Sequence, residues 1–210
     1  MTRIVLIRHG QTVWNREQRF RGQADIELDE VGLKQAQVTG RCVAARWPVV
    51  AVYASPLRRT TQTARAIADA QGLTVEPLGG LLDINFGEWQ GQLAQDVAHR
   101  FPELFKDWEK APHTVHFPGG ESLDEVRRRV VSALDDVVAR HPGQAIALVS
   151  HTVVNRVLLC VVLGWGNDRF WRVHQETCAV NVFDVEEDGS FTIVQLNSTH
   201  HLHTITGGEG

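Results

Sequence analysis

The stretch IVLIRHG, residues 4–10, sets the framework of the fold, because its apolar run ends abruptly in Arg8 and His9. A short run that is apolar at every position is typical of a strand buried on both faces. Two further runs share this composition: VVAVYA, residues 49–54, and AIALV, residues 145–149. Fully buried strands occur mainly in parallel sheets, so the three runs predict the centre of a mostly parallel sheet.

Segments with helical periodicity follow these runs. Pro56 can open a helix and Gly72 can end it, which predicts a helix over about residues 57–70. A second helix is predicted after Ser122, because Ser122 and Glu125 form a capping-box pattern ahead of an apolar stripe with helical spacing. Strands and helices thus alternate along the chain.

This alternation predicts a three-layer α/β/α fold, with helices on both faces of a mostly parallel central sheet. Residues 180–185 and 191–196, joined through EEDGS, are expected to form a hairpin. The stretch from about 78 to 120 breaks the periodicity, which predicts an excursion that serves as a lid over the active site. We expect residues 1–210 to form a single domain.

The composition argues against several classes of partner. The 210 residues carry a formal net charge of −4, without the basic excess that neutralises nucleic acid or anionic membranes. The longest late apolar run, VLLCVVLGW, is less than half a membrane span. Cys42, Cys160 and Cys178 form no C-x-x-C pair, which favours a reducing cytoplasm over a disulfide framework. We therefore expect a cytoplasmic protein without nucleic-acid or membrane partners, and leave a homodimer open.

Polar side chains follow the predicted strands at the point where each strand ends. Arg8 and His9 follow the run that begins at residue 4, and His151 follows residues 145–149. The arginines of SPLRR, residues 55–59, follow residues 49–54. Ligands of open α/β sheets bind beyond the carboxyl ends of the strands. Guanidinium groups and helix N-termini at this edge of the sheet can bind a phosphate group. One histidine that is kept neutral can attack the phosphorus atom, while a second, protonated histidine holds the phosphate oxygens. The sequence therefore predicts a site for phosphoryl transfer.

Three motifs resemble those of the histidine phosphatase superfamily, the phosphoglycerate mutase-like branch, and the resemblance covers nearly the whole chain. RHGQTVWNREQRFRGQADIELDEVG, residues 8–32, is similar to its N-terminal signature. SPLRRTTQTA, residues 55–64, is similar to its second motif, and LVSHTVV, residues 148–154, to its third. The resemblance implies a phosphoglycerate mutase-like fold and catalysis through a phosphorylated histidine.

The resemblance also implies a role for individual residues. It places the phosphoryl group on His9 and selects Arg59 over Arg58 as a phosphate ligand. In LLDINFGEWQG, residues 81–91, Asp83 stands where the family commonly has a glutamate proton donor, with Glu88 as the alternative. The implied catalytic set is Arg8, His9, Arg59, Asp83 and His151. The implied substrate-binding set is Asn15, Gly22, Gln23, Asn85, Thr152 and His200.

The implied activity is hydrolysis of a small phosphorylated metabolite without a metal or any other cofactor. Segments such as HTVHFPGGESL and RFWRV are similar to metal-independent phosphoserine phosphatases, which carry histidine at the position of Asn85. An α-ribazole phosphatase, a cofactor-dependent phosphoglycerate mutase-type phosphotransferase and a non-catalytic phosphate-binding module are the alternatives. The E-R-H-Y-G stretch of those mutases is absent, which favours a phosphatase.

Three other features are expected to be structural. The arginine run at residues 127–129 flanks an apolar helix stripe and predicts a solvated face. Trp171, like the other tryptophans, is expected to pack in the core or the lid. His200, His201 and His203 lie in a tail that is predicted to form a terminal strand over the site.

Overall fold

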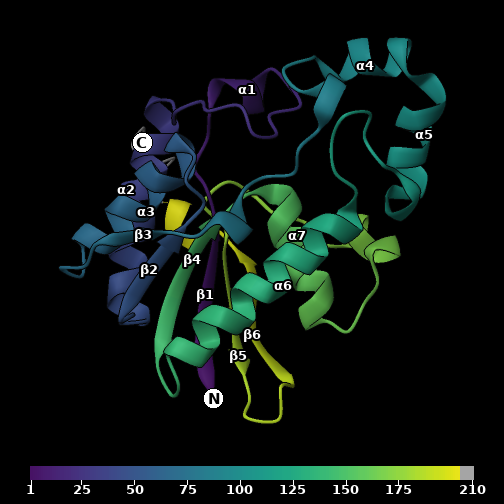
Figure 1. Cartoon of the computed structure of the whole chain (residues 1–210). Coiled ribbons are helices and arrows are strands. Elements are labelled where there is room, and N and C mark those ends of the chain that lie inside the picture. Colours follow the sequence, from purple (N-terminus) through teal and green to yellow (C-terminus); the bar gives the residue numbers. More distant parts are fainter. Residues whose placement is uncertain (204–210) are drawn as a thin grey trace.

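A six-stranded sheet forms the centre of the molecule in the computed structural model, which describes residues 1–203 (Figure 1). Its strands are β1 (Thr2–Arg8), β2 (Ala51–Ala54), β3 (Val75–Pro77), β4 (Ala145–Ser150), β5 (Val180–Val185) and β6 (Phe191–Ser198). They are ordered β3-β2-β4-β1-β5-β6; the first four run parallel, and β5 and β6 are antiparallel to their neighbours. The predicted mostly parallel sheet and C-terminal hairpin are therefore confirmed.

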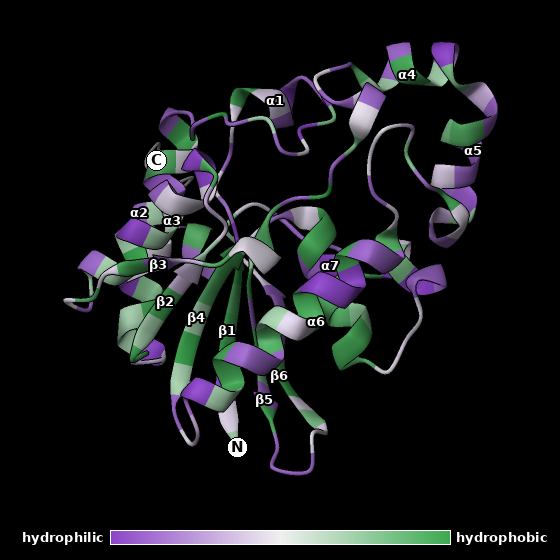
Figure 2. Cartoon of the chain, in the orientation of Figure 1, coloured by the Kyte–Doolittle hydropathy of each residue, from purple (hydrophilic) through white to green (hydrophobic). Residues whose placement is uncertain are grey.

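Seven α-helices are found among the described residues. They are α1 (Val13–Arg16), α2 (Glu30–Arg46), α3 (Arg58–Asp69), α4 (Ala94–Arg100), α5 (Pro102–Lys110), α6 (Leu123–Arg140) and α7 (Thr152–Val162). Alternate side chains of a strand point to opposite faces of its sheet. Accordingly, Val5 and Ile7 of β1 pack with α2 and α3, whereas Ile4 and Leu6 pack with α6 and α7. Apolar residues run along β1 and β4 (Figure 2), and the predicted three-layer α/β/α fold is confirmed.

The capping box predicted ahead of α6 is present. The Ser122 amide donates to Glu125 Oε2 at 2.7 Å, and the Glu125 amide donates to Ser122 Oγ at 3.3 Å. These bonds satisfy backbone donors that have no partner within the helix, so α6 begins at a defined residue. The helix predicted over about residues 57–70 is α3, which begins at Arg58 and ends at Asp69.

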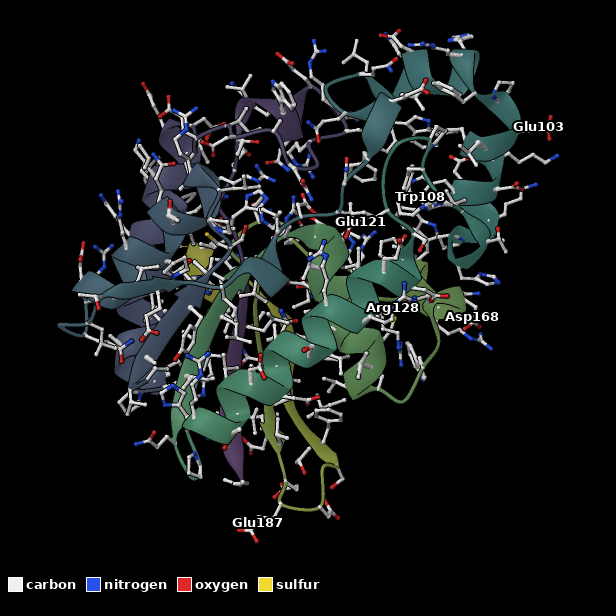
Figure 3. All side chains as sticks on the ribbon, viewed as in Figure 1. Glu103, Trp108, Glu121, Arg128, Asp168 and Glu187 are labelled. Carbon is white, nitrogen blue, oxygen red and sulfur yellow. The ribbon has the colours of Figure 1, made fainter. Side chains whose placement is uncertain are left out.

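The arginine run on α6 is only partly solvated. Arg128 is exposed and extends away from the helix (Figure 3), as predicted. Arg129 is not: its Nη1 donates to the carbonyl oxygens of Gly80 and Leu82 at 3.0 and 2.6 Å, and its Nε pairs with Glu121 at 2.9 Å. The prediction is wrong for Arg129, because a loop distant in sequence turns its carbonyls toward this side chain.

Residues 78–120 extend beyond the carboxyl ends of the strands, where Figure 1 shows α4 and α5. Aromatic rings hold this segment to the rest of the molecule. Trp108 of α5, labelled in Figure 3, lies 5.1 Å from Trp171 between ring centroids, and Phe86 lies 5.0 Å from Phe20. These edge-to-face contacts place the segment above the end of the sheet at which the histidines lie.

The described part of the tail does not form the strand that was predicted to cover the site. Strand β6 ends at Ser198, and a short 3-10 helix, His200–Leu202, packs beside α2. The bond between His201 Nε2 and Thr39 Oγ1, 3.0 Å long, ties the tail to that helix instead. Residues 204–210 lie outside the described part. Within residues 1–203, no helix combines the length and apolarity needed to cross a membrane.

Candidate active site

The two histidines predicted to share the site lie at the ends of neighbouring strands. Arg8 of β1 is the register partner of Ser150 of β4, so His9 and His151 follow paired positions. The His9 amide donates to the Ser150 carbonyl at 3.0 Å, and the two imidazole centroids are 5.3 Å apart. Both side chains are fully buried. The spacing between adjacent strands therefore fixes the distance between the histidines.

His9 presents an unprotonated nitrogen. Its Nδ1 lies 2.7 Å from the Gly10 carbonyl oxygen, which can only accept, so Nδ1 carries the hydrogen. The Nε2 atom is then a lone-pair nitrogen, and it is buried without a hydrogen-bond partner. Burial, and next the positive charges of Arg59 and Arg8, hold the pKa of His9 well below its usual value. A neutral, unpartnered imidazole nitrogen has the properties of a nucleophile.

His151 is also neutral in this arrangement. Its Nδ1 accepts a hydrogen bond from Arg59 Nε at 3.2 Å, so its Nε2 carries the hydrogen and donates to Ser55 Oγ at 2.8 Å. Burial, followed by the charges of Arg59 and His9, holds the pKa of His151 well below its usual value. The protonated form that the sequence predicts belongs to a site that holds a phosphoryl group, and it stays a prediction.

Two arginines lie at the same end of the sheet. Arg8 Nη1 donates to the Gln175 carbonyl at 2.6 Å, while its Nε is buried without a partner. Arg59 is fully buried at the start of α3. Arg58, its neighbour, is exposed and pairs with Asp25 at 3.2 Å. The structure thus places Arg59 beside His151 and Asp83, and Arg58 on the surface.

Asp83 joins this group from the excursion. Its Oδ2 lies 3.2 Å from Arg59 Nη2 and 3.6 Å from His151 Nδ1, and its side chain is buried. Burial raises the pKa of Asp83, and the charge of Arg59 opposes this effect. Glu88, the alternative donor, is exposed and pairs with Arg100 at 3.9 Å. Asp83 is therefore the carboxyl group that the fold brings to the histidines.

A cavity of about 450 Å³ is lined by Arg8 and Asp83, whereas the buried His9, Arg59 and His151 lie behind its surface and do not line it. Its floor includes Arg8, Asp83 and Thr152, the first residue of α7, whose Oγ1 is buried without a partner. Backbone amides at a helix N-terminus point toward such a space and favour an anion there. Residues from the excursion form another wall: Phe86, Ala94, Phe105, Trp108 and Glu109.

The substrate-binding residues implied by the family have different positions. Asn15 and Thr152 line the cavity, although Asn15 Oδ1 also accepts from Thr12 Oγ1 at 2.8 Å and thereby caps α1. Gln23 does not line it; its Nε2 donates to the Asp83 carbonyl at 3.2 Å. Gly22 does not line it either and has a φ of +48°, and its carbonyl accepts from Arg59. Gly22 and Gln23 thus contact Arg59 and Asp83 through hydrogen bonds.

Asn85 and His200 are not among the residues that line the cavity. Asn85 Oδ1 accepts from the Gly87 amide at 2.9 Å and stabilises the turn between them. His200 lies on the short 3-10 helix beside α2, with its ring 5.5 Å from that of His203. Within the described residues, the substrate-binding role that the family implies for these two side chains stays a prediction.

Sequence reasoning overlooked three residues of the cavity wall. Arg21 and Arg156 both line the cavity, and the Nε atom of each is buried without a partner. Trp171, which we expected only to pack, lines the cavity as well. Two features of the sequence could have indicated these residues. Arg21 precedes Gly22, and Arg156 follows Thr152 by one helical turn. Among residues 1–203, no three histidine, cysteine or acidic side chains are grouped as metal ligands.

Comparisons with known proteins agree with this geometry. The model of the histidine phosphatase superfamily (branch 1) matches residues 4–199. Phosphoserine phosphatase 1 of Hydrogenobacter thermophilus is 38% identical over 202 residues, which cover 96% of this chain and 95% of that protein. The probable phosphoglycerate mutase GpmB of Yersinia pestis is 31% identical over 206 residues, with 96% and 95% covered. The solved structure of Bacillus stearothermophilus YhfR superposes with a TM-score of 0.91 at 27% identity, covering 96% of this chain and 100% of that one.

The family match thus extends from β1 to the residue after β6, and it includes the strands that position both histidines. The fold, the paired strand ends and the relatives lead to one assignment. This chain belongs to the histidine phosphatase superfamily, branch 1, and is a phosphatase.

Proposed function

We propose that this phosphatase hydrolyses a small phosphate monoester through a phosphohistidine at His9, and that phosphoserine is a substrate. The orphaned Nε2 atom of His9 is the observation that carries the proposal, because a buried, unprotonated nitrogen without a partner is poised to bond to phosphorus. The similarity to a phosphoserine phosphatase favours this substrate.

The first transfer moves the phosphoryl group from the substrate oxygen to His9. Nε2 attacks phosphorus in line with the leaving oxygen, and the P–O bond breaks as the P–N bond forms. Arg8, whose Nε is free, and the backbone amides at the start of α7 hold the equatorial oxygens. Asp83 gives its proton to the departing alkoxide.

Substrate binding changes the environment of Asp83. In the described arrangement Arg59 bonds to Asp83, to His151 and to the carbonyls of Gly22 and Ala24. A phosphate that draws the Arg59 guanidinium toward itself removes the positive charge that favours the Asp83 carboxylate. Burial then dominates, and the protonated acid is favoured when a leaving oxygen needs a proton.

The second transfer returns the phosphoryl group to water. Asp83 is now a carboxylate and accepts a proton from the attacking water, so the P–N bond breaks and inorganic phosphate is released. His9 recovers its lone pair, and Asp83 recovers its proton. In a mutase, by contrast, the phosphoryl group returns to an organic acceptor.

A rapid-quench experiment with phosphorus-labelled phosphoserine tests this function. The expected result is an alkali-stable, acid-labile label on the protein and release of inorganic phosphate. His9→Ala should lose label and turnover, whereas His99→Ala, on the exposed surface of α4, should retain both. A label that survives His9→Ala would overturn the nucleophile assignment, and label that moves to an organic product without free phosphate would favour the mutase.

Three further parts of the proposal concern the whole chain. The excursion over residues 78–120 acts as a lid of a single domain, since it supplies both Asp83 and one wall of the cavity.

The three cysteines are free thiols, which suits a reducing cytoplasm. A homodimer remains a prediction, which sedimentation analysis tests.

A further inference from the structure

Arg156 lies one helical turn beyond the proposed phosphate position. It is four residues after Thr152 on α7, and both residues line the same cavity. Side chains at positions i and i+4 share a helix face, and four residues rise about 6 Å along the axis. Arg8 and Arg21 line this cavity too, and burial, followed by the positive charges of Arg21 and Arg156, lowers the pKa of Arg8.

Aromatic rings hold the Arg156 guanidinium in place. Its Cζ atom lies 4.8 Å from the ring centroid of Trp171 and 5.3 Å from that of Phe170. The Trp171 indole is itself fixed, because its Nε1 donates to the Trp108 carbonyl at 2.7 Å. A stacked guanidinium loses little freedom when it forms a further bond, so its open edge is preorganised for a ligand.

The charge of Arg156 is uncompensated. Its guanidinium has no hydrogen-bond or ion-pair partner anywhere in residues 1–203, and its Nε is buried. Two carboxylates, Glu109 and Glu176, also line the cavity. Both are exposed, and neither forms an ion pair with Arg156; Glu176 accepts from His174 Nε2 at 2.7 Å instead. A partly buried cation without an anion is costly, so a ligand that supplies one is favoured.

We propose that Arg156 binds a second anionic group of the substrate, a carboxylate, while Arg8 and the start of α7 bind its phosphate. The substrate class is then a short carboxylic acid that also carries a phosphate monoester. The fork of a guanidinium matches the two oxygens of a carboxylate, which fixes the orientation of the substrate. This inference rests on the proposed phosphatase reaction, and it adds the class of substrate that the cavity prefers.

Phosphoserine and phosphoethanolamine test the subsite, because they differ only in the carboxylate. We expect the protein to prefer phosphoserine. Arg156→Gln should lower kcat/KM for phosphoserine about 10- to 100-fold, the usual effect of removing a hydrogen bond between charged groups, and mainly by raising KM. The loss for phosphoethanolamine should be much smaller. Arg128→Gln, on the exposed face of α6, is the matched control and should change neither substrate.

Arg156→Lys separates the shape of the side chain from its charge. Lysine lacks the planar fork, so part of the preference should be lost while the positive charge is kept. Thermal unfolding and turnover of p-nitrophenyl phosphate identify a variant that has not folded, in which case Arg156→Lys carries the comparison. Equal losses for phosphoserine and phosphoethanolamine, or no preference in the unmodified protein, would overturn the subsite. Absence of turnover with every ester would instead overturn the phosphatase reaction and the subsite together.

Discussion

Asp83 is the residue at which this chain departs from the pattern of its family, where a glutamate is common. The side chain is one methylene shorter, yet it lies 3.2 Å from Arg59 and 3.6 Å from His151. The loop brings it there: Gln23 Nε2 and Arg129 Nη2 both donate to the Asp83 carbonyl, at 3.2 and 3.1 Å. These two hydrogen bonds hold the main chain of Asp83 where its shorter side chain reaches Arg59.

The acid role of Asp83 predicts a dependence on the leaving group. Asp83→Asn should slow the first turnover of phosphoserine by about a hundredfold to ten-thousandfold, the usual contribution of a general acid. The first turnover of p-nitrophenyl phosphate should slow far less, because nitrophenolate departs without a proton. Pre-steady-state release of each alcohol is the measurement. Equal first-turnover losses would remove Asp83 from this role, and Glu88→Gln serves as the surface control.

Part of the candidate site could be predicted from the sequence. His9 and His151 follow runs that are apolar at every position, so burial of the strands places both at one edge of the sheet. Arg21 and Arg156 were missed because an isolated arginine is usually solvated, and only the folded chain shows that their Nε atoms are buried. The neutral state of His151 was also beyond sequence reasoning, since it depends on the hydrogen bond from Arg59.

Helix α6 lies on the face of the sheet opposite α2 and α3, and it positions the loop that carries Asp83. Arg129 holds the carbonyls of Gly80, Leu82 and Asp83 together, and Glu121 fixes the Arg129 guanidinium. Periodicity places Arg129 outside the apolar stripe of α6, which is why the sequence predicts solvent around it. The carbonyl partners of Arg129 come from residues 46 to 49 positions away, a relation that local pattern cannot show.

Removal of this side chain should affect stability and catalysis together. Arg129→Ala leaves the carbonyls of Gly80 and Leu82 without this donor, whereas the Asp83 carbonyl keeps Gln23 and Glu121 keeps the Asn85 amide. The cost is about 1–3 kcal/mol, which lowers the melting temperature by several degrees in a chain of this size. We expect kcat to fall as well, because the Asp83 backbone is released. Thermal unfolding and steady-state kinetics measure the two effects. Arg128→Ala should match the unmodified protein, and an unchanged Arg129→Ala would contradict the role of the loop contacts.

At the scale of the whole molecule, the mechanism that we propose uses only side chains and backbone amides for phosphoryl transfer. Arg8, Arg59 and the start of α7 supply the positive field that a metal ion supplies in other phosphatases. Activity should therefore survive exhaustive treatment with EDTA and should not rise when magnesium is added. Turnover of p-nitrophenyl phosphate before and after chelation is the measurement. Loss of turnover that a divalent ion restores would contradict a metal-free mechanism.

The register between Arg8 and Ser150 has a consequence for the evolution of this enzyme. The two histidines depend on the central strands, whereas Phe86, Phe105 and Trp108 depend on the excursion between β3 and α6. Insertions, deletions or recombination in the excursion alter the cavity wall without changing the distance between the histidines. The reaction chemistry is kept as long as the turn that carries Asp83 is kept. A lineage can thus acquire new metabolite specificity by exchanging one contiguous segment while it inherits the reaction chemistry intact.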